Sequence, residues 1–327
     1  MFNSPHVQTL WAPFFRAKPK IDRVAEKFQF SDGDHCWLYW AGRALITPRS
    51  NVVVLMHGLS GSADSLYMLC MQRHLLSLGL PSVAINYRGA GGKPNNKARN
   101  YHAGETQDLH EVFSQWQRQR PDQHFFALGF SLGGSRLLNF LSEGHQPQIL
   151  GAVAVCVPLD LAVCENRINQ GFSKVYRYHL LKGLVADMTG KLSHLESVAP
   201  VEAGKLKRLG DLNRLKTFRE YDSRVICALY DFEDANDYYR RCSALPKLKN
   251  ITNSVVLIQA PDDPLMTENT LPTRDQLGAG VRLLTRKGGH VGFVDGLPFD
   301  PCYWLEHSIG GLLDSFTEKC EPVQINE

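Results

Sequence analysis

Four residues of this 327-residue chain have the types and the order that nucleophilic catalysis requires. Ser131 lies in a Gly-x-Ser-x-Gly motif, Asp262 and Asp263 form an acidic pair, and His290 follows further along the chain. A serine hydroxyl is a weak nucleophile until a base removes its proton, and histidine, with an ordinary pKa of about 6.5, suits that role. A carboxylate on the second ring nitrogen orients the imidazole and stabilises its cation. The set therefore predicts covalent catalysis by Ser131.

The residues around Ser131 predict the element that would hold it. The aromatic and apolar run at 125–130 predicts a buried strand, and residues 135–141 predict a helix. A sharp turn between them would hold the serine in a strained backbone conformation, where only small neighbours such as Gly129 and Gly133 fit. The helix would direct unpaired N–H groups at the serine oxygen. A turn of this composition without chemistry is the alternative.

The acid and the base each follow a predicted strand. Asp262 and Asp263 come directly after the apolar run at 254–259, and His290 comes shortly after the run at 281–284. We prefer Asp263 as the acid because Pro264 follows it and the turn should aim it at His290, whereas Asp262 would cap the turn. Asp262 stays open as the alternative acid, and His290 could also be an ordinary loop histidine.

Two backbone N–H groups are candidates for an oxyanion hole. Leu132 follows the nucleophile and supplies the first, and Leu59, in the turn after the strand at 52–56, supplies the second. His57 in that turn is interpreted as structural. Arg88 is interpreted as a residue that fixes its loop, with substrate contact as the alternative.

The order of elements predicts the fold class. Residues 51–157 alternate strand and helix three times, which favours a mostly parallel sheet of about eight strands with helices on both faces. A hairpin with its turn at 31–34 precedes it, and residues 1–20 predict an ordered arm without helical period. We expect a core at 1–158, an inserted helical cap at 159–245, the rest of the core at 246–327, and a last helix over 304–318.

Composition narrows the function classes. The chain is 43% hydrophobic and 21% charged with a net charge of +3, which is too weak a bias to indicate nucleic-acid binding. It shows no apolar run of 18 residues and no secretory signal, so we expect no stable membrane insertion. Eight scattered cysteines without a C-x-x-C pair favour reduced thiols and a cytoplasmic protein. The basic segment 205–209 is interpreted as a solvated helix face, with an anionic head group as the alternative.

Several motifs together resemble the α/β-hydrolase superfamily and, within it, AB hydrolase family four. They are Pro5–Leu10, His57-Gly58-Leu59, Asn86–Gly89, Gly129–Gly134, Asp262-Asp263-Pro264, Tyr238–Ser243 and Gly288–Phe293. The resemblance implies a carboxylic-ester hydrolase with Ser131, Asp263 and His290 as its triad. Relatives act on acyl esters and, in eukaryotes, on phospholipids. Membrane-anchored relatives carry an N-terminal hydrophobic helix that is not seen here, which argues against a membrane lipid as substrate.

The sequence thus predicts a serine esterase that cleaves a short- to medium-chain acyl ester through an acyl-enzyme. One alternative is an acyltransferase that uses the same triad. Another is a non-catalytic binding protein on a hydrolase fold, because fold alone does not set function. We expect no metal and no organic cofactor, since acid, base and nucleophile are all side chains. The expected partner is a small-molecule ester, and oligomeric state is not predicted. The cap residues Phe172, Val175, Leu180 and Leu184 predict an apolar acyl pocket.

Overall fold

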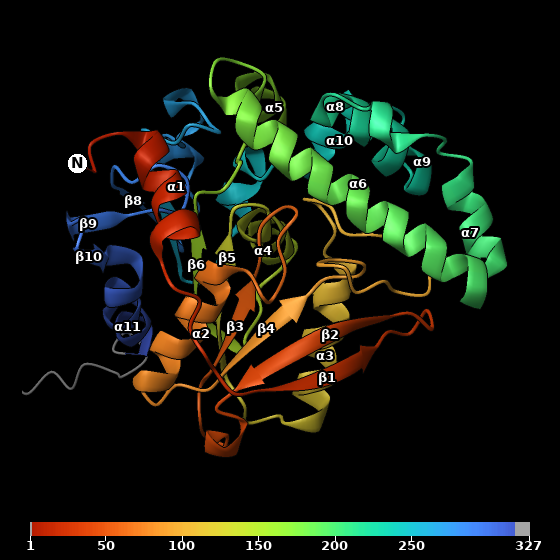
Figure 1. Ribbon diagram of the computed structural model, residues 1–327. Coiled ribbons are helices and arrows are strands. Elements are labelled where there is room, and N and C mark those ends of the chain that lie inside the picture. The colour runs from red at the N-terminus through yellow and green to blue at the C-terminus, as the bar shows by residue number, and fades with distance from the viewer. Residues whose placement is uncertain (1, 318–327) are drawn as a thin grey trace, which may run out of the picture.

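An eight-stranded sheet forms the centre of the computed structural model, which describes residues 2–317 (Figure 1). Its strand order is β1-β2-β4-β3-β5-β6-β7-β8. The strands are β1 (Arg23–Gln29), β2 (His35–Ala41), β3 (Val52–Met56), β4 (Ser82–Asn86), β5 (Phe125–Phe130), β6 (Ile149–Val155), β7 (Val255–Gln259) and β8 (Val281–Thr285). Within this sheet β2 pairs antiparallel with both β1 and β4, and every pair from β4 through β3 to β8 is parallel. The predicted fold class is confirmed.

The central strands are apolar on both sides because helices cover both faces of the sheet. In β3, Val52, Val54 and Met56 pack into one hydrophobic cluster, whereas Val53 and Leu55 pack into a second. Side chains alternate across a strand, so a strand covered on both faces must be apolar throughout. The first cluster also holds residues of α3 (Gln107–Gln119) and α4 (Leu132–Ser142). The second holds residues of α2 (Leu66–Ser77) and α11 (Trp304–Thr317).

A run of helices separates β6 from β7. It comprises α5 (Leu161–Ile168), α6 (Ser173–Val198), α7 (Pro200–Lys207), α8 (Phe218–Tyr221), a π-helical turn at Asp222–Ile226, α9 (Cys227–Leu229) and α10 (Ala235–Cys242). Figure 1 shows these helices gathered on one side of the sheet, with α6 as the longest among them. Short 3₁₀ helices occur at Arg43–Leu45, Leu212–Arg214, Leu245–Asn250, Glu268–Thr270 and Arg274–Gln276.

The sequence predicts that this segment is helical but not where its helices end. Helix α7 ends at Lys207, because Gly210 adopts a left-handed conformation with φ of +72° that a helix cannot continue through. Helix α6 is 26 residues long. The basic segment does lie on an exposed face, where Lys205 pairs with Glu202 and Lys207 with Glu196.

Helix α6 is held on the core through the loop that follows β4. Asp187 accepts hydrogen bonds from the backbone N–H groups of Gly91 and Gly92 at 3.3 and 2.9 Å. The ammonium group of Lys191 donates to the carbonyl oxygen of Arg99 at 2.8 Å. Burial lowers the pKa of Lys191 to about 7. These contacts anchor the helical segment to the sheet beside the strand ends.

Arg88, the second residue after β4, joins the hairpin to α3. Its side chain is 1% exposed and donates to the carboxylates of Asp108, Asp34 and Asp32 at 2.7–3.0 Å. A planar guanidinium has five N–H donors in a fixed fork, so it can bind one carboxylate through two bonds and still donate to others. The role expected for Arg88, fixing its loop, agrees with these contacts.

The sequence analysis missed one helix and one pair of strands. Residues 1–20 were expected to form an arm without helical period, but they contain the helix α1 (Pro5–Phe15). Pro5 lies in its first turn, where the backbone N–H that proline lacks would have no intrahelical partner. Pro13 interrupts the pattern and obscures the period. A small antiparallel pair of strands, β9 (Val294–Leu297) and β10 (Asp300–Tyr303), follows the loop at 286–293 that carries His290, called the histidine loop below. Glu318, the predicted end of the last helix, and Cys320 lie outside the described residues.

Across residues 2–317 we find no helix with the length and apolarity needed to cross a bilayer.

The hairpin predicted at 31–34 is present as the β1–β2 connection, with Gly33 at a φ of +82°. Left-handed backbone of this kind favours glycine, which explains the residue at the turn.

Candidate active site

Ser131 stands in a strained turn between β5 and α4. Its φ is +51°, a value that side-chain-bearing residues rarely adopt. The turn is tight: a Cβ atom on Gly129 would lie 2.6 Å from the carbonyl oxygen of Gly133, and one on Gly133 would collide with the carbonyl oxygen of Met56. Both flanking glycines are therefore required sterically. The strand, turn and helix agree with the sequence expectation.

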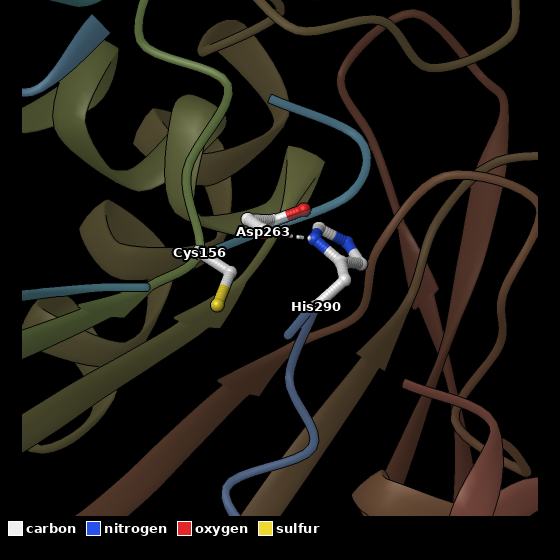
Figure 2. Close-up of side chains that lie close together, drawn as sticks. All are labelled: Cys156, Asp263 and His290. Atoms are coloured by element: carbon white, nitrogen blue, oxygen red, sulfur yellow. Dashed lines mark hydrogen bonds and ion pairs between the residues drawn. The ribbon is translucent and has the colours of Figure 1, made fainter. Parts of the chain in front are cut away.

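His290 and Asp263 complete a chain of hydrogen bonds that begins at Ser131. The Nε2 atom of His290 lies 3.0 Å from the Ser131 Oγ, and its Nδ1 lies 2.7 Å from Asp263 Oδ2. Figure 2 shows the carboxylate directed at the imidazole. Because a carboxylate accepts, Nδ1 carries the proton that it receives, and Nε2 is free to accept the serine O–H. The Asp263 side chain is 2% exposed and that of His290 is 14% exposed.

Asp262 occupies a different position from its neighbour. Its Oδ1 accepts hydrogen bonds from the backbone N–H groups of Gly288 and Gly289 at 2.9 and 3.2 Å. Those glycines directly precede His290, so the carboxylate anchors the loop that carries the imidazole. Asp262 was expected to cap its own turn, but its carboxylate binds the backbone of the histidine loop instead.

Between residues 2 and 317, positive φ occurs at five residues other than glycine, and they are Ser60, Ser131, Cys156, Val291 and Phe293. Four of them belong to the Ser131 turn, to the end of β6 or to the histidine loop. Positive φ is especially costly for a β-branched residue, and Val291 has a φ of +61°. Backbone strain persists where surrounding contacts enforce it, and it clusters at functional sites.

The Cys156 thiol contacts the backbone of this strained loop. Its sulfur accepts a hydrogen bond from the Val291 N–H at 3.3 Å, and the thiol lies 3.7 Å from the Gly289 carbonyl oxygen. Figure 2 shows its side chain beside Asp263 and His290. The sulfur, a carboxylate oxygen and a ring nitrogen lie within 4.8 Å of one another, a set that could hold a metal ion. Burial, with the Asp263 charge next, raises the thiol pKa well above its ordinary value. A protonated thiol is a poor ligand, which favours a packing role.

Helix α1 supplies contacts that the sequence analysis did not foresee. The Thr9 hydroxyl accepts a hydrogen bond from the His290 N–H at 2.9 Å. The Gln8 side chain accepts a hydrogen bond from the Val294 N–H at 2.6 Å and donates one to the Val294 carbonyl oxygen at 2.9 Å. A Cβ atom on Gly289 would collide with the Pro5 carbonyl oxygen. The only signal for this role was the resemblance of residues 5–10 to a family motif.

The turn after β3 faces Ser131 from the other side. Tyr67 accepts a hydrogen bond from the Gly58 N–H at 2.8 Å. His57 is fully buried, donates from Nδ1 to the Gly58 carbonyl oxygen at 2.9 Å and accepts the Tyr87 N–H on Nε2 at 3.4 Å. Burial lowers the His57 pKa to about 3, so the ring is neutral. These contacts agree with a structural role for His57.

The backbone N–H groups of Leu59 and Leu132 border the same space. Among the residues that the structure describes, neither group donates a hydrogen bond to a protein acceptor. Leu132 is the first residue of α4, and the N–H groups of a first helical turn have no intrahelical partner. Both residues line the cavity next to Ser131. Their free donors suit the capture of an oxyanion.

A cavity of about 830 Å³ opens beside Ser131 and His290. It extends between the turns of the core and the helices α1, α5, α6, α8 and α10, and most of its walls are apolar. Of the pocket residues predicted from sequence, Val175, Leu180 and Leu184 line it. Phe172 does not: its ring packs on His6, with centroids 4.7 Å apart.

Comparison with known proteins gives a consistent family signal. Residues 51–297 match the family model described as alpha/beta hydrolase fold. The chain is 34% identical over 320 residues to the protein named "Putative esterase YheT" of Escherichia coli (strain K12), covering 97% of this chain and 92% of the relative. It is 26% identical over 298 residues to the human protein named phospholipase ABHD3, covering 89% of this chain and 71% of that one.

Solved structures show the same architecture. The esterase Pf2001 of Pyrococcus furiosus superposes with a TM-score of 0.56 at 14% sequence identity, covering 91% of this chain and 93% of that structure. At this level of identity the likeness concerns the fold alone.

Proposed function

Because this chain belongs to the alpha/beta hydrolase family, we propose that it cleaves carboxylic esters through a covalent acyl-enzyme on Ser131. One observation carries the proposal: Ser131, His290 and Asp263 form a continuous hydrogen-bonded chain at the edge of an apolar cavity. The relatives described as an esterase and a phospholipase support ester hydrolysis as the reaction class.

The first half of the proposed reaction forms the acyl-enzyme. The Ser131 Oγ attacks the ester carbonyl while its proton passes to Nε2 of His290. Asp263 stabilises the imidazolium through Nδ1, from which it is 2.7 Å away. The carbonyl oxygen becomes an alkoxide, which the Leu59 and Leu132 N–H groups would hold. The tetrahedral centre then expels the alcohol, which takes its proton from Nε2.

The second half regenerates the enzyme. Water attacks the acyl carbon, His290 accepts its proton, and the acid leaves as Ser131 recovers its hydrogen. An acyltransferase would deliver the acyl group to another alcohol or thiol at this step. Product analysis with and without an added alcohol distinguishes the two, since transfer yields a new ester.

We also propose that residues 159–245 act as a cap that shapes the acyl site, between core segments at 1–158 and 246–327. The cavity walls support this, because they combine core turns with α5, α6, α8 and α10. The predominantly apolar lining suits a short- to medium-chain acyl group of a small-molecule ester.

A chain-length series of p-nitrophenyl esters tests the proposal, with wild type beside Ser131→Ala. Turnover that disappears in the variant and peaks at one acyl length supports it. A folded Ser131→Ala protein with full esterase activity would contradict it. Stoichiometric labelling of wild type, but not of the variant, by a fluorophosphonate reports on Ser131 without depending on the substrate chosen.

A further inference from the structure

The charge on the walls of the cavity is entirely negative apart from its histidines. Among the described residues that line it, Glu165 and Asp222 are the acidic ones, and no lysine or arginine lines it. Burial, then the charge of Arg136, lowers the pKa of the lining His102 to about 3, so this ring adds no positive charge near neutral pH. An anionic substrate group would meet two carboxylates here, and the nearby Arg219, which is not among the lining residues, pairs with Glu165.

The two carboxylates differ in how far the protein satisfies them. Glu165 accepts hydrogen bonds from the Asn169 side chain at 2.7 Å and from the Arg219 N–H at 3.4 Å, and the Arg219 guanidinium lies 3.7 Å away. Asp222 receives one hydrogen bond, from the Tyr239 hydroxyl to Oδ2 at 2.7 Å. Within residues 2–317, no cation lies at ion-pair distance from Asp222, and its Oδ1 accepts no hydrogen bond.

The Asp222 carboxylate therefore has free hydrogen-bond acceptor capacity at the wall of a mostly apolar cavity. Burial raises its pKa to about 7, against the lowering effect of the Tyr239 hydrogen bond. Asp222 is half-buried, and its unpaired Oδ1 faces a mostly apolar cavity, so a ligand that supplied a cationic donor would improve its solvation. Asp222 also begins a π-helical turn, a rare feature that occurs often at functional sites.

The surroundings of Asp222 suit a cation as well. The rings of Phe218, Tyr221 and Tyr239, on the helices that carry Asp222 and its partner, also line the cavity. Aromatic faces attract ammonium groups through the ring quadrupole. A carboxylate beside aromatic rings thus offers charge pairing and favourable contact to the same group.

We propose that Asp222 is a specificity-determining residue that binds an ammonium group on the ester substrate. The inference rests on the proposed function and names its substrate class: an ester with an alkylammonium group in its acyl or alkoxy part. Ser131 and His290 act on the ester carbonyl while Asp222 holds the charged end. Anionic esters are disfavoured by the same carboxylate.

Matched esters test this preference. p-Nitrophenyl ω-aminoalkanoates are compared, at each chain length, with neutral alkanoates, ω-hydroxyalkanoates and ω-carboxyalkanoates. A parallel series of alkanoate esters of ω-amino alcohols and of simple alcohols is followed by acid release. We expect wild type to favour an ammonium ester in kcat/KM by about tenfold or more over its neutral partner, a size typical of hydrogen bonds to charged groups. A preference for the neutral or carboxylate ester in both series overturns the proposal, as does an equal preference for hydroxyl and ammonium.

Variants assign the preference to Asp222. Asp222→Asn keeps the shape and removes the charge, so the ratio of ammonium to neutral kcat/KM should fall about tenfold or more. The matched control is Asp231→Asn, at an exposed residue in the turn between α9 and α10 that does not line the cavity, which should keep the wild-type ratio. A wild-type ratio in folded Asp222→Asn overturns the assignment.

Tyr239→Phe covers the case in which Asp222→Asn does not fold. It removes the hydroxyl that stabilises the ionised carboxylate, so the ammonium preference should fall severalfold, and an unchanged preference overturns the proposal. Calorimetric binding of n-octylammonium and of 1-octanol to Ser131→Ala separates this inference from the proposed function. If wild type hydrolyses no ester, esterase activity fails, while tighter binding of the ammonium than of the alcohol still supports Asp222 recognition. Equal binding overturns it.

Discussion

Asp262 and Asp263 are adjacent in sequence but hold the histidine loop at two different points. Asp262 accepts the backbone N–H groups of Gly288 and Gly289, and Asp263 accepts the Nδ1 proton of His290. One carboxylate fixes where the loop lies, and the other fixes how the imidazole is oriented. Their substitution should therefore affect different properties of the protein.

Asp263→Asn should lower kcat by a factor on the order of 10⁴ with little change in folding, because an amide favours the wrong imidazole tautomer. Asp262→Asn should cost about 1–3 kcal/mol in stability, because a neutral amide anchors the two N–H groups less well, and should reduce kcat much less. Steady-state kinetics and thermal melting of both variants check this. Equal kinetic losses would contradict the separation of roles.

Loss of Ser131 or of His290 should each remove most of the catalysis, and the double variant should be little worse than either single one. The effects of substituting residues that act as one unit are strongly non-additive, because the other members no longer contribute to catalysis once one is lost. Activities of Ser131→Ala, His290→Ala and the double variant on one p-nitrophenyl ester give the comparison. Fully additive losses would show that the two residues act independently.

Gly133→Ala should prevent normal folding of the serine turn, because its Cβ would collide with the Met56 carbonyl oxygen and lie 2.6 Å from that of His57. The strand ends would have to separate, and we expect destabilisation of several kcal/mol, on the order of the largest single-substitution effects. Gly190→Ala is the matched control. Gly190 lies within α6 with open space around it, so alanine should stabilise by up to about 1 kcal/mol. Chemical denaturation of both measures the difference.

Arg88→Met should destabilise by about 3–5 kcal/mol, because it leaves the carboxylates of Asp34 and Asp108 buried without their cation. Addition of Asp108→Asn to this variant should restore part of the loss, since one of those charges is then removed. The free energies of unfolding of the two single variants and the double variant form a thermodynamic cycle. A coupling energy near zero would indicate that Arg88 and Asp108 do not stabilise each other.

Acid should destabilise the protein through two buried histidines. Burial lowers the pKa of both His57 and His102 to about 3, whereas in the unfolded chain each titrates near 6.5. Between these values the unfolded state binds more protons, so stability falls as pH falls from about 6.5 towards about 3. Each histidine contributes about 1.4 kcal/mol per pH unit to that slope. His102→Asn, which keeps an acceptor for the Gly104 N–H, should reduce the slope measured by denaturation at a series of pH values.

The parts of the structure that were predictable from sequence are those fixed by local pattern. The run from Phe125 to Leu141 contains its own strand, turn and helix, and the structure has all three. The apolar strands and the helical segment after Pro158 were recognised in the same way. The acidic pair was predictable as a pair, but which carboxylate reaches His290 depends on the path of a loop that no local rule fixes.

The missed features depend on contacts between distant segments. Thr9 and His290 are 281 positions apart, and Gln8 and Val294 are 286 apart. No periodicity in residues 1–20 announces such partners, and the two prolines hide the helix that presents them. The positive φ of Val291 is equally invisible, since the residue type argues against it and only the surrounding contacts impose it.

The bonds from α1 to the histidine loop also bear on synthesis. Helix α1 is translated before the loop that it binds, so Thr9 must wait for His290, 281 positions later, and Gln8 for Val294, 286 positions later. Ser131 would emerge long before His290 and its anchors exist. A chain terminated before residue 290 can thus present the serine turn without its proposed base, so the proposed reactivity is delayed until the histidine loop has been translated.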